Sequence, residues 1–186
     1  DTLGDNVLAV TASSATYPAE ERCAAEKLAK NLGARHMVVV TKELDDPNFA
    51  ANPPNRCYYC KLELYSKLWK IASENNLKYV VDGTNYDDLR DFRPGIQAAN
   101  KLGVRHPLQE VRLTKAAIRQ LSREMNLSTW DKPTFACLAS RFPYKTKITP
   151  ENLVKVDEAE RFLRELGLKQ VRVRHHGSIG SIARIE

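Results

Sequence analysis

The sequence has 186 residues, 42% of them hydrophobic and 28% charged, which is typical of a globular protein long enough to bury a core. It contains no apolar run near the roughly 18 residues of a membrane-spanning helix and no secretory leader, so we expect a cytoplasmic protein with no membrane partner. The formal charge of +6 favours an anionic partner. That partner could be a nucleic acid or a phosphorylated small molecule, and charge alone does not choose between them, although no basic run or aromatic-basic interleaving typical of a nucleic-acid platform is present.

The first half of the chain alternates strand patterns with helix patterns. Its predicted elements are a strand at 6–11, a helix at 19–32 closed by Gly33, a strand at 35–41, a helix at 58–75 and a strand at 77–81. The second strand is apolar throughout, which suits a sheet covered on both faces. This order predicts βαβ units in a doubly wound parallel α/β sheet, whose ligands gather beyond the carboxyl ends of the strands.

The second half has fewer regular patterns. A helix at 114–126 has Thr114 as its cap, and a helix from Thr149 to Leu166 stops at Gly167. Strands at 169–175 and 181–186 are predicted to pair through a turn at 177–180. The C-terminal part is therefore expected to combine one helix with a small strand pair.

Cysteine spacing is the most informative chemical pattern. Cys57 and Cys60 stand three residues apart at a helix start, so their thiols project from one face of the first turn. The helix N-terminus and a basic residue beside each thiol favour the thiolate, which binds metal and reacts as a nucleophile. Cys137 lies in a turn of small residues that could present it to a cleft, whereas Cys23 is expected to be a small buried apolar residue.

Three thiolates have a different chemical use from four. A structural zinc site closes with four protein ligands, but three leave one position open for water, substrate or sulfur. A cubane iron-sulfur cluster held by three thiolates would likewise leave one iron open. The alternative is that Cys57 and Cys60 form an ordinary surface pair and never meet Cys137.

Two further segments could bind a ligand. In the turn after the third predicted strand, Gly83 allows close backbone approach, and Thr84 and Asn85 can bond a nucleotide, although an ordinary turn explains them equally well. Arg172 and Arg174 alternate onto one face of a predicted strand, where two guanidinium groups could clamp a phosphate or form a solvated polar face.

Several segments together resemble the LarE family of PP-loop ATP pyrophosphatases. The similarity spans nearly all of the chain, and Ser-Arg-Phe-Pro-Tyr following a cysteine is its most specific motif. The segments are Asp-Gly-Thr-Asn at 82–85, Asp-Phe-Arg-Pro-Gly at 91–95, Cys-Leu-Ala-Ser-Arg-Phe-Pro-Tyr at 137–144 and Val-Arg-Val-Arg at 171–174.

The resemblance implies sulfur insertion into pyridinium-3,5-biscarboxylic acid mononucleotide, a step towards the nickel-pincer nucleotide cofactor of lactate racemase. ATP with Mg²⁺ would adenylate a substrate carboxylate, and sulfur would then be delivered to it. One group of the family sacrifices the sulfur of a single cysteine, matched by Cys137. Another uses three cysteines and a [4Fe-4S] cluster, matched by Cys57, Cys60 and Cys137. We favour the cluster type, in which the open iron carries an extra sulfide that attacks the adenylate.

The resemblance also implies roles for other residues. Arg172 and Arg174 would grip the substrate phosphate. The cofactor-binding set would include Gly83, Thr84, Asn85 and Ser140, and the catalytic set Cys137, Arg141 and Glu160. We also expect a homo-oligomer.

One family motif is missing. The pyrophosphate loop Ser-Gly-Gly-x-Asp-Ser, which belongs just before Asp1, is absent, so the backbone cradle for ATP phosphates is missing. We therefore expect a longer polypeptide, with 1–145 as a PP-loop domain lacking its first strand and 146–186 as the sulfur-transfer part. Two rival functions stay open: a tRNA-thiolating enzyme of the same superfamily, and a non-catalytic zinc-stabilised module.

Overall fold

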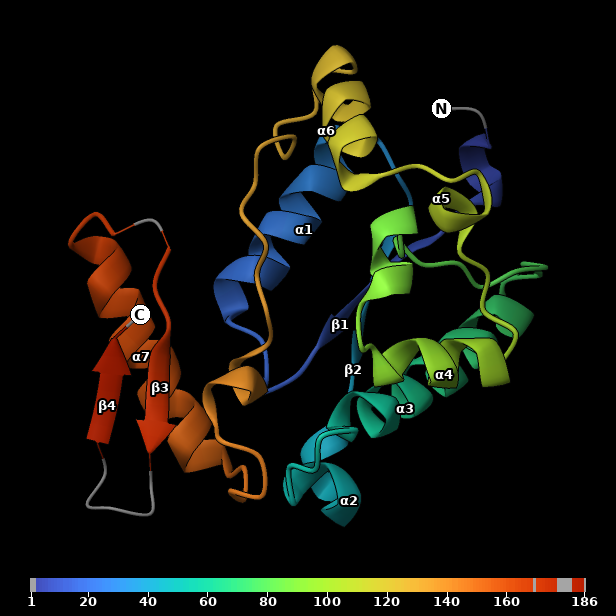
Figure 1. Cartoon of the computed structure of the whole chain (residues 1–186). Helices are drawn as coiled ribbons and strands as arrows, with labels where there is room; N and C mark the ends of the chain where they lie inside the picture. The colour runs from blue at the N-terminus through green and yellow to red at the C-terminus, as the bar shows by residue number, and fades with distance from the viewer. Residues whose placement is uncertain (1–2, 169, 177–181, 186) are drawn as a thin grey trace.

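The computed structural model describes residues 3–168, 170–176 and 182–185, and it shows a mixed α/β protein (Figure 1). None of the described helices is both long and apolar enough to cross a membrane. The helices are α1 (Ala19–Asn31), α2 (Pro47–Ala50), α3 (Arg56–Glu74), α4 (Pro94–Lys101), α5 (Pro107–Glu110), α6 (Lys115–Glu124) and α7 (Pro150–Glu165). The strands are β1 (Ala9–Ser13), β2 (His36–Val40), β3 (Val173–His176) and β4 (Ile182–Ile185).

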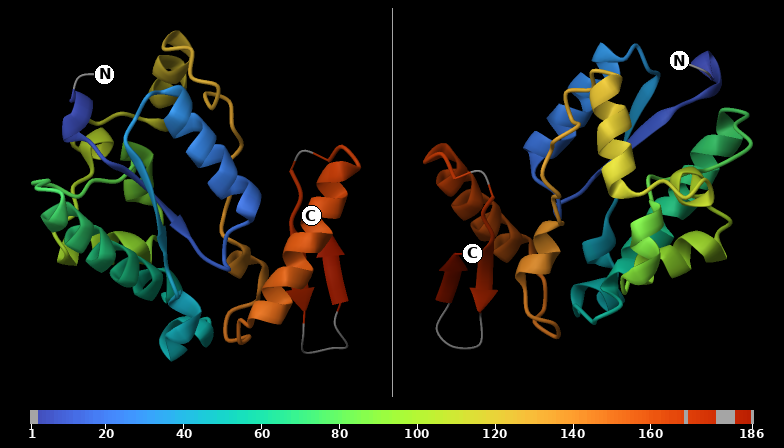
Figure 2. Two further views of the ribbon diagram at one scale, coloured as in Figure 1. Left: turned by 180° about the vertical axis from the view of Figure 1, so that it is seen from behind. Right: turned by 45° about the horizontal axis from the view of Figure 1, so that its top comes forward.

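A small parallel sheet forms the centre of the N-terminal part. β1 pairs with β2, Ala9 facing His36 and Ser13 facing Val40, and α1 is the crossover that a parallel pair requires. Gly33 follows α1 with φ +63°, a conformation that favours glycine. Figures 1 and 2 show α1 on one side of the two strands and α3 with α4 on the other. The first two predicted strands and the predicted helix at 19–32 are confirmed with shifted ends.

The third predicted strand, at 77–81, is wrong as a strand. Val81 only forms a parallel bridge with Arg105, whose N–H donates to Val80 O at 3.0 Å. A cavity of about 460 Å³, lined by Val10 of β1 and Val80 among others, lies between this segment and the sheet. In the described residues this parallel sheet consists of β1 and β2 alone, and the doubly wound sheet stays a prediction.

The core has two clusters of buried side chains. One joins α3, α4 and the segment at 80, through Tyr65, Ala72, Val80, Ala99 and Val104. The other joins α2, the Cys137 segment and α7. It consists of Phe49, Leu138, Ala139, Phe142, Ile148, Leu153 and Val156. Burial of this apolar surface stabilises the contact, so the second cluster fixes the Cys137 segment against α7.

The C-terminal part matches its predicted elements. Thr149 caps α7 by accepting a hydrogen bond from Asn152 N at 3.3 Å, and Thr114 caps α6. β3 and β4 form an antiparallel pair, while the predicted turn at 177–180 lies outside the described residues. The short helices α2, α4 and α5, each beginning at a proline, were not predicted. No observation tests the division into two domains, which stays a prediction.

Cys23 differs from its prediction. It is exposed on α1 rather than buried. The physical reason is that α1 buries only Ala29 among its residues and presents the rest of its surface outward or at its edges.

Candidate functional site

The first turn of α3 carries two of the candidate cysteines. The helix begins where Arg56 N–H donates to Pro53 O at 3.0 Å, and the following residue, Cys57, is exposed. Cys60 is half-buried and packs against the cluster that contains Phe49 and Leu138. The two thiols therefore share the start of one helix but differ in their access to solvent.

Cys137 reaches the same cluster from a distant part of the chain. It precedes a short 3-10 turn, Leu138–Arg141, and packs against the cluster that Cys60 touches. Leu138 N–H donates to Thr16 O at 2.8 Å, which holds the Cys137 segment against the loop after β1.

The electrostatics place the three thiols in one neighbourhood. The pKa of Cys60 is raised to about 12, chiefly by burial and then by the charges of Glu43, Cys137 and Cys57, with Lys61 acting in the opposite direction. Burial also raises the pKa of Cys137, with Cys57 as the next cause. Tyr17 has a raised pKa for the same reasons, burial first and then all three cysteines. We call Cys57, Cys60 and Cys137 the thiol centre.

The thiol centre matches an iron-sulfur cluster in donor type, because cysteine thiolates are the ligands of such clusters. Within the described residues, no group of three His, Cys, Asp or Glu side chains is arranged to hold a single metal ion, whose thiolates lie within about 4 Å of each other because Zn–S is about 2.3 Å. The residues that would hold such a cluster are Cys57, Cys60 and Cys137.

Two cavities open beside the thiol centre. One, of about 540 Å³, lies at the carboxyl ends of β1 and β2 and is lined by Ser14, Glu43 and Cys60 among others. The second, of about 430 Å³, is lined by Cys57, Asp82 and other residues. Lys61 lines both cavities. Both are within the size range of small-molecule sites.

The predicted ligand turn lies partly in the second cavity. Gly83 and Thr84 line it, whereas Asn85 is not among its lining residues. The Asn85 side chain instead accepts a hydrogen bond from Asp87 N at 2.9 Å and caps the short helix Tyr86–Arg90. Asn85 therefore has a structural contact that sequence reasoning did not foresee.

Asp82 is the best-anchored carboxylate of this cavity. Its Oδ2 accepts a hydrogen bond from Tyr65 Oη at 2.5 Å, and its Oδ1 accepts one from Thr84 N at 2.9 Å and lies 2.7 Å from His106 Nδ1. Burial alone would raise the Asp82 pKa, but these hydrogen bonds outweigh it and lower the pKa below its ordinary value. Asp82 is therefore a fixed negative charge.

Glu43 was missed from the sequence. It is 2% exposed, and its Oε1 accepts hydrogen bonds from Ser14 Oγ and Thr16 Oγ1, both at 2.6 Å. In the described part of the chain, its Oε2 has no hydrogen-bond partner. The segment Lys42-Glu43-Leu44 resembles an ordinary surface turn, so no sequence signal marks this carboxylate.

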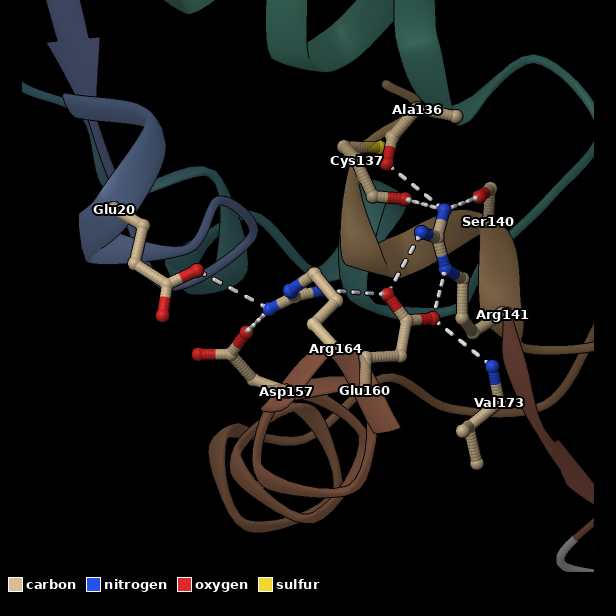
Figure 3. Close-up of polar contacts among 9 residues, drawn as sticks. All are labelled: Glu20, Ala136, Cys137, Ser140, Arg141, Asp157, Glu160, Arg164 and Val173. Atoms are coloured by element: carbon tan, nitrogen blue, oxygen red, sulfur yellow. Dashed lines mark hydrogen bonds and ion pairs between the residues drawn. The ribbon is translucent and has the colours of Figure 1, made fainter. Parts of the chain in front are cut away.

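Arg141 and Glu160 form a buried pair (Figure 3). Their side chains are 2% and 0% exposed. Arg141 Nε donates to Glu160 Oε1 at 2.7 Å, and Nη2 donates to Oε2 at 3.0 Å. Arg141 Nη1 donates to Ala136 O and Ser140 Oγ, each at 2.8 Å. Every guanidinium nitrogen has an acceptor, so this pair holds the Cys137 segment against α7.

The network continues beyond the pair. Glu160 Oε1 also accepts a hydrogen bond from Val173 N at 3.0 Å, which fastens β3 to α7. Arg164 Nη1 lies 3.6 Å from Glu160 Oε2, and Arg164 Nη2 donates to Glu20 Oε2 at 3.3 Å. Figure 3 shows Arg164 between these two carboxylates. The sulfur-bearing turn, α7, β3 and α1 are thus linked by one set of charges.

The two arginines predicted to clamp a phosphate do not lie in the same element. Arg172 is exposed and precedes β3, whereas Arg174 lies in β3 and donates to Ser140 O at 3.1 Å. Arg184, opposite Arg174 on β4, is a further cation that sequence reasoning missed. Strand register brings it there, and register cannot be deduced from one short strand.

Comparisons with known proteins add relatives but no family model, because none matches. A Synechocystis protein described as "Uncharacterized protein slr1717" is 49% identical over 186 residues, covering all of this chain and 68% of that protein. "Pyridinium-3,5-bisthiocarboxylic acid mononucleotide synthase" of Lactiplantibacillus plantarum is 41% identical over 183 residues, 98% of this chain and 66% of the synthase. "Uncharacterized protein MJ0830" of Methanocaldococcus jannaschii is 37% identical over 131 residues, 70% of this chain and 51% of that protein.

The chain thus spans about two thirds of the length of two of these relatives and about half of the third. Identity of 41% across 98% of this chain is far above what unrelated sequences show. The chain belongs to the LarE family, the family of the Lactiplantibacillus plantarum synthase.

Proposed function

We propose that this chain is part of an ATP-dependent sulfurtransferase that replaces a carboxylate oxygen of pyridinium-3,5-biscarboxylic acid mononucleotide with sulfur. The observation that carries the proposal is that Cys60 and Cys137 pack against one core cluster while Cys57 and Cys60 line two cavities that share Lys61. The name of the Lactiplantibacillus plantarum relative supports it, because that protein is named for a bisthiocarboxylic acid mononucleotide.

The first step would activate the carboxylate. One substrate carboxylate oxygen attacks the α-phosphorus of ATP, and the bond from that phosphorus to pyrophosphate breaks, giving an acyl-adenylate and pyrophosphate with its Mg²⁺. Lys61 lines both cavities, so its ammonium group is placed to neutralise phosphate charge that develops in either one. Ser14 and Cys60 belong to the cavity at the strand ends, where parallel sheets bind their ligands.

The second step would deliver sulfur. A sulfur nucleophile attacks the acyl carbon, the bond from that carbon to the AMP oxygen breaks, and AMP leaves with its electron pair. A [4Fe-4S] cluster held by Cys57, Cys60 and Cys137 would supply an external sulfide when bound, so that the polypeptide keeps its own sulfur. Without a cluster, the sulfur would come from Cys137 itself.

Other residues would position the substrate. Arg172 and Arg174 are proposed to bind the mononucleotide phosphate, with Gly83, Thr84 and Asn85 as the predicted nucleotide turn. Arg174 donates to Ser140 O, so a phosphate held by Arg174 would be close to the turn that follows Cys137. Arg141 and Glu160 would act by holding this turn in place, since their side chains are buried in a mutual pair.

The test uses three cysteine variants of the complete protein, purified without oxygen. Cys137→Ala abolishes product in both mechanisms, whereas Cys57→Ala abolishes it only in the cluster mechanism. Cys23→Ala is the matched control, because Cys23 is an exposed thiol on α1. Product is measured by mass spectrometry as the exchange of one oxygen for sulfur, and intact protein mass shows whether the polypeptide has lost sulfur.

Each result has a distinct meaning. Full activity of Cys57→Ala together with loss of sulfur from the wild-type polypeptide would replace the cluster mechanism by the sacrificial one. Full activity of Cys137→Ala would refute sulfur delivery by this centre. Tight, salt-sensitive tRNA binding by the wild-type protein would instead favour the tRNA-thiolating rival.

A further inference from the structure

Arg56, immediately before Cys57, is a buried cation whose bonding is incomplete. Its side chain belongs to a residue that is only 7% exposed, and its Nε has no hydrogen-bond partner among the described residues. Its guanidinium carbon lies 5.3 Å from the centre of the Tyr144 ring. None of the ion pairs found across residues 3–168, 170–176 and 182–185 includes Arg56.

Such an environment is costly without an anion. A buried charge loses its hydration, and an aromatic face returns only part of that free energy. Arg141, which is buried to a similar degree, has acceptors for all of its nitrogens. No carboxylate of the described residues pairs with Arg56, so its incomplete bonding points to another negative group beside it.

The thiols are candidates for that negative group. Arg56 is the neighbour of Cys57 in sequence and opens the helix that carries Cys60. Tyr144, on which Arg56 stacks, lies in the segment that follows Cys137. Burial and Cys57 raise the pKa of Cys137, whereas the charge of Arg56 lowers it. Arg56 is therefore linked to Cys57 and Cys60 through the start of α3 and to the Cys137 segment through Tyr144.

We propose that Arg56 is a positioning residue whose guanidinium group is the fixed counter-charge of the thiol centre when it holds an iron-sulfur cluster. The inference rests on the proposed function, which places the cluster on Cys57, Cys60 and Cys137. Three thiolates bring three negative charges into a partly buried region, and one fixed cation beside them favours both cluster retention and the addition of an electron. Net charge and hydrogen bonds to sulfur are known determinants of cluster potential.

The test measures reduction potential and iron content rather than turnover. Arg56→Met removes the charge and keeps an apolar stem, and Arg56→Lys restores the charge without the planar fork. We expect Arg56→Met to disfavour reduction about tenfold, which is a potential about 59 mV more negative for a one-electron step. We also expect it to lower iron retention about tenfold or more in chelator competition, as the loss of groups that surround metal ligands does. Arg56→Lys recovers most of the potential. Arg119→Met, an exposed position on α6, is the matched control.

The outcomes separate the two proposals. If the anaerobic wild-type protein binds no iron and sulfide, the cluster itself is refuted, and the role of Arg56 with it. If the wild-type protein and Arg56→Met hold the cluster with equal potential and equal retention, the Arg56 inference alone is refuted. Should Arg56→Met fail to fold, the Arg56→Lys variant provides the test. A reduction potential near that of the wild-type protein, with reduced iron retention, supports the role of the charge. A shifted potential together with lost iron retention overturns that role.

Discussion

Two buried arginines lie close to the sulfur-bearing turn, and they differ in how completely the polypeptide satisfies them. Arg141 has an acceptor for each of its nitrogens, including both oxygens of Glu160. Arg56 has an unpartnered Nε within the described structure and stacks on Tyr144. The fully bonded arginine belongs to the framework of the fold, and the incompletely bonded one lies beside the thiols that would hold a ligand.

The same contrast holds for two buried carboxylates. Glu160 is 0% exposed, with both oxygens occupied, whereas Glu43 is 2% exposed with one oxygen lacking a partner in the described residues. Buried polar groups are almost always hydrogen-bonded. Arg56 Nε and Glu43 Oε2 are therefore exceptions close to the thiol centre, in contrast to the fully bonded Arg141–Glu160 pair, although Asp157 Oδ1 on α7 also lacks a hydrogen-bond partner among the described residues.

The largest expected effect comes from breaking the satisfied pair. Glu160→Gln leaves the Arg141 charge buried without its carboxylate, so we expect the free energy of unfolding to fall by about 3–5 kcal/mol, measured by urea unfolding. Glu26→Gln is the control, because Glu26 pairs with Arg22 where both side chains are 43% exposed, and such pairs contribute less than about 1 kcal/mol. Equal losses in the two variants would contradict the assignment of the pair to the framework.

A smaller effect is expected at the helix that carries Glu160. Thr149→Ala removes the side chain that accepts from Asn152 N, and loss of such a cap costs about 1 kcal/mol. Thr114→Ala removes the equivalent cap of α6 and serves as the comparison in thermal unfolding. A loss at Thr149 as large as that of Glu160→Gln would show that the cap, rather than the ion pair, fixes α7.

The smallest effect is expected at Arg56 in metal-free protein. Arg56→Met removes an unpaired buried charge and an aromatic contact together, and because these changes oppose each other we expect unfolding free energy to change by less than about 1 kcal/mol. Arg141→Met, measured alongside by urea unfolding in the presence of a chelator, loses several times more. Equal destabilisation by the two variants would remove the distinction between the arginines.

Local signals explain which helices could be predicted. Thr114 and Thr149 act as caps within three residues of their partners, and Gly33 ends α1 with a positive φ. These contacts involve neighbouring residues, so the sequence contains them directly. The strand predicted at 77–81 failed because strand pairing depends on a distant partner, and Val81 meets Arg105 instead of β1.

The candidate site was predictable to the extent that its chemistry follows residue type. Cysteine spacing drew attention to Cys57, Cys60 and Cys137, whose thiol groups have few structural uses in such a pattern. Glu43 could not be found, because a buried carboxylate and an exposed one have the same letter. Arg141 and Glu160 were named from family resemblance, but only coordinates show that they bind each other.

The hydrogen bond from Val173 N to Glu160 has a geometric consequence. It joins β3, which carries Arg174, to the Arg141–Glu160 pair that holds the Cys137 segment. If Arg174 binds the substrate phosphate, the distance from that phosphate to the Cys137 sulfur would therefore be fixed. A pyridinium ring with carboxylates at two positions could then place only one of them next to the sulfur in a given bound orientation. Under the proposed function, modification of the second carboxylate would then require the substrate to dissociate and to rebind with its ring in the opposite orientation.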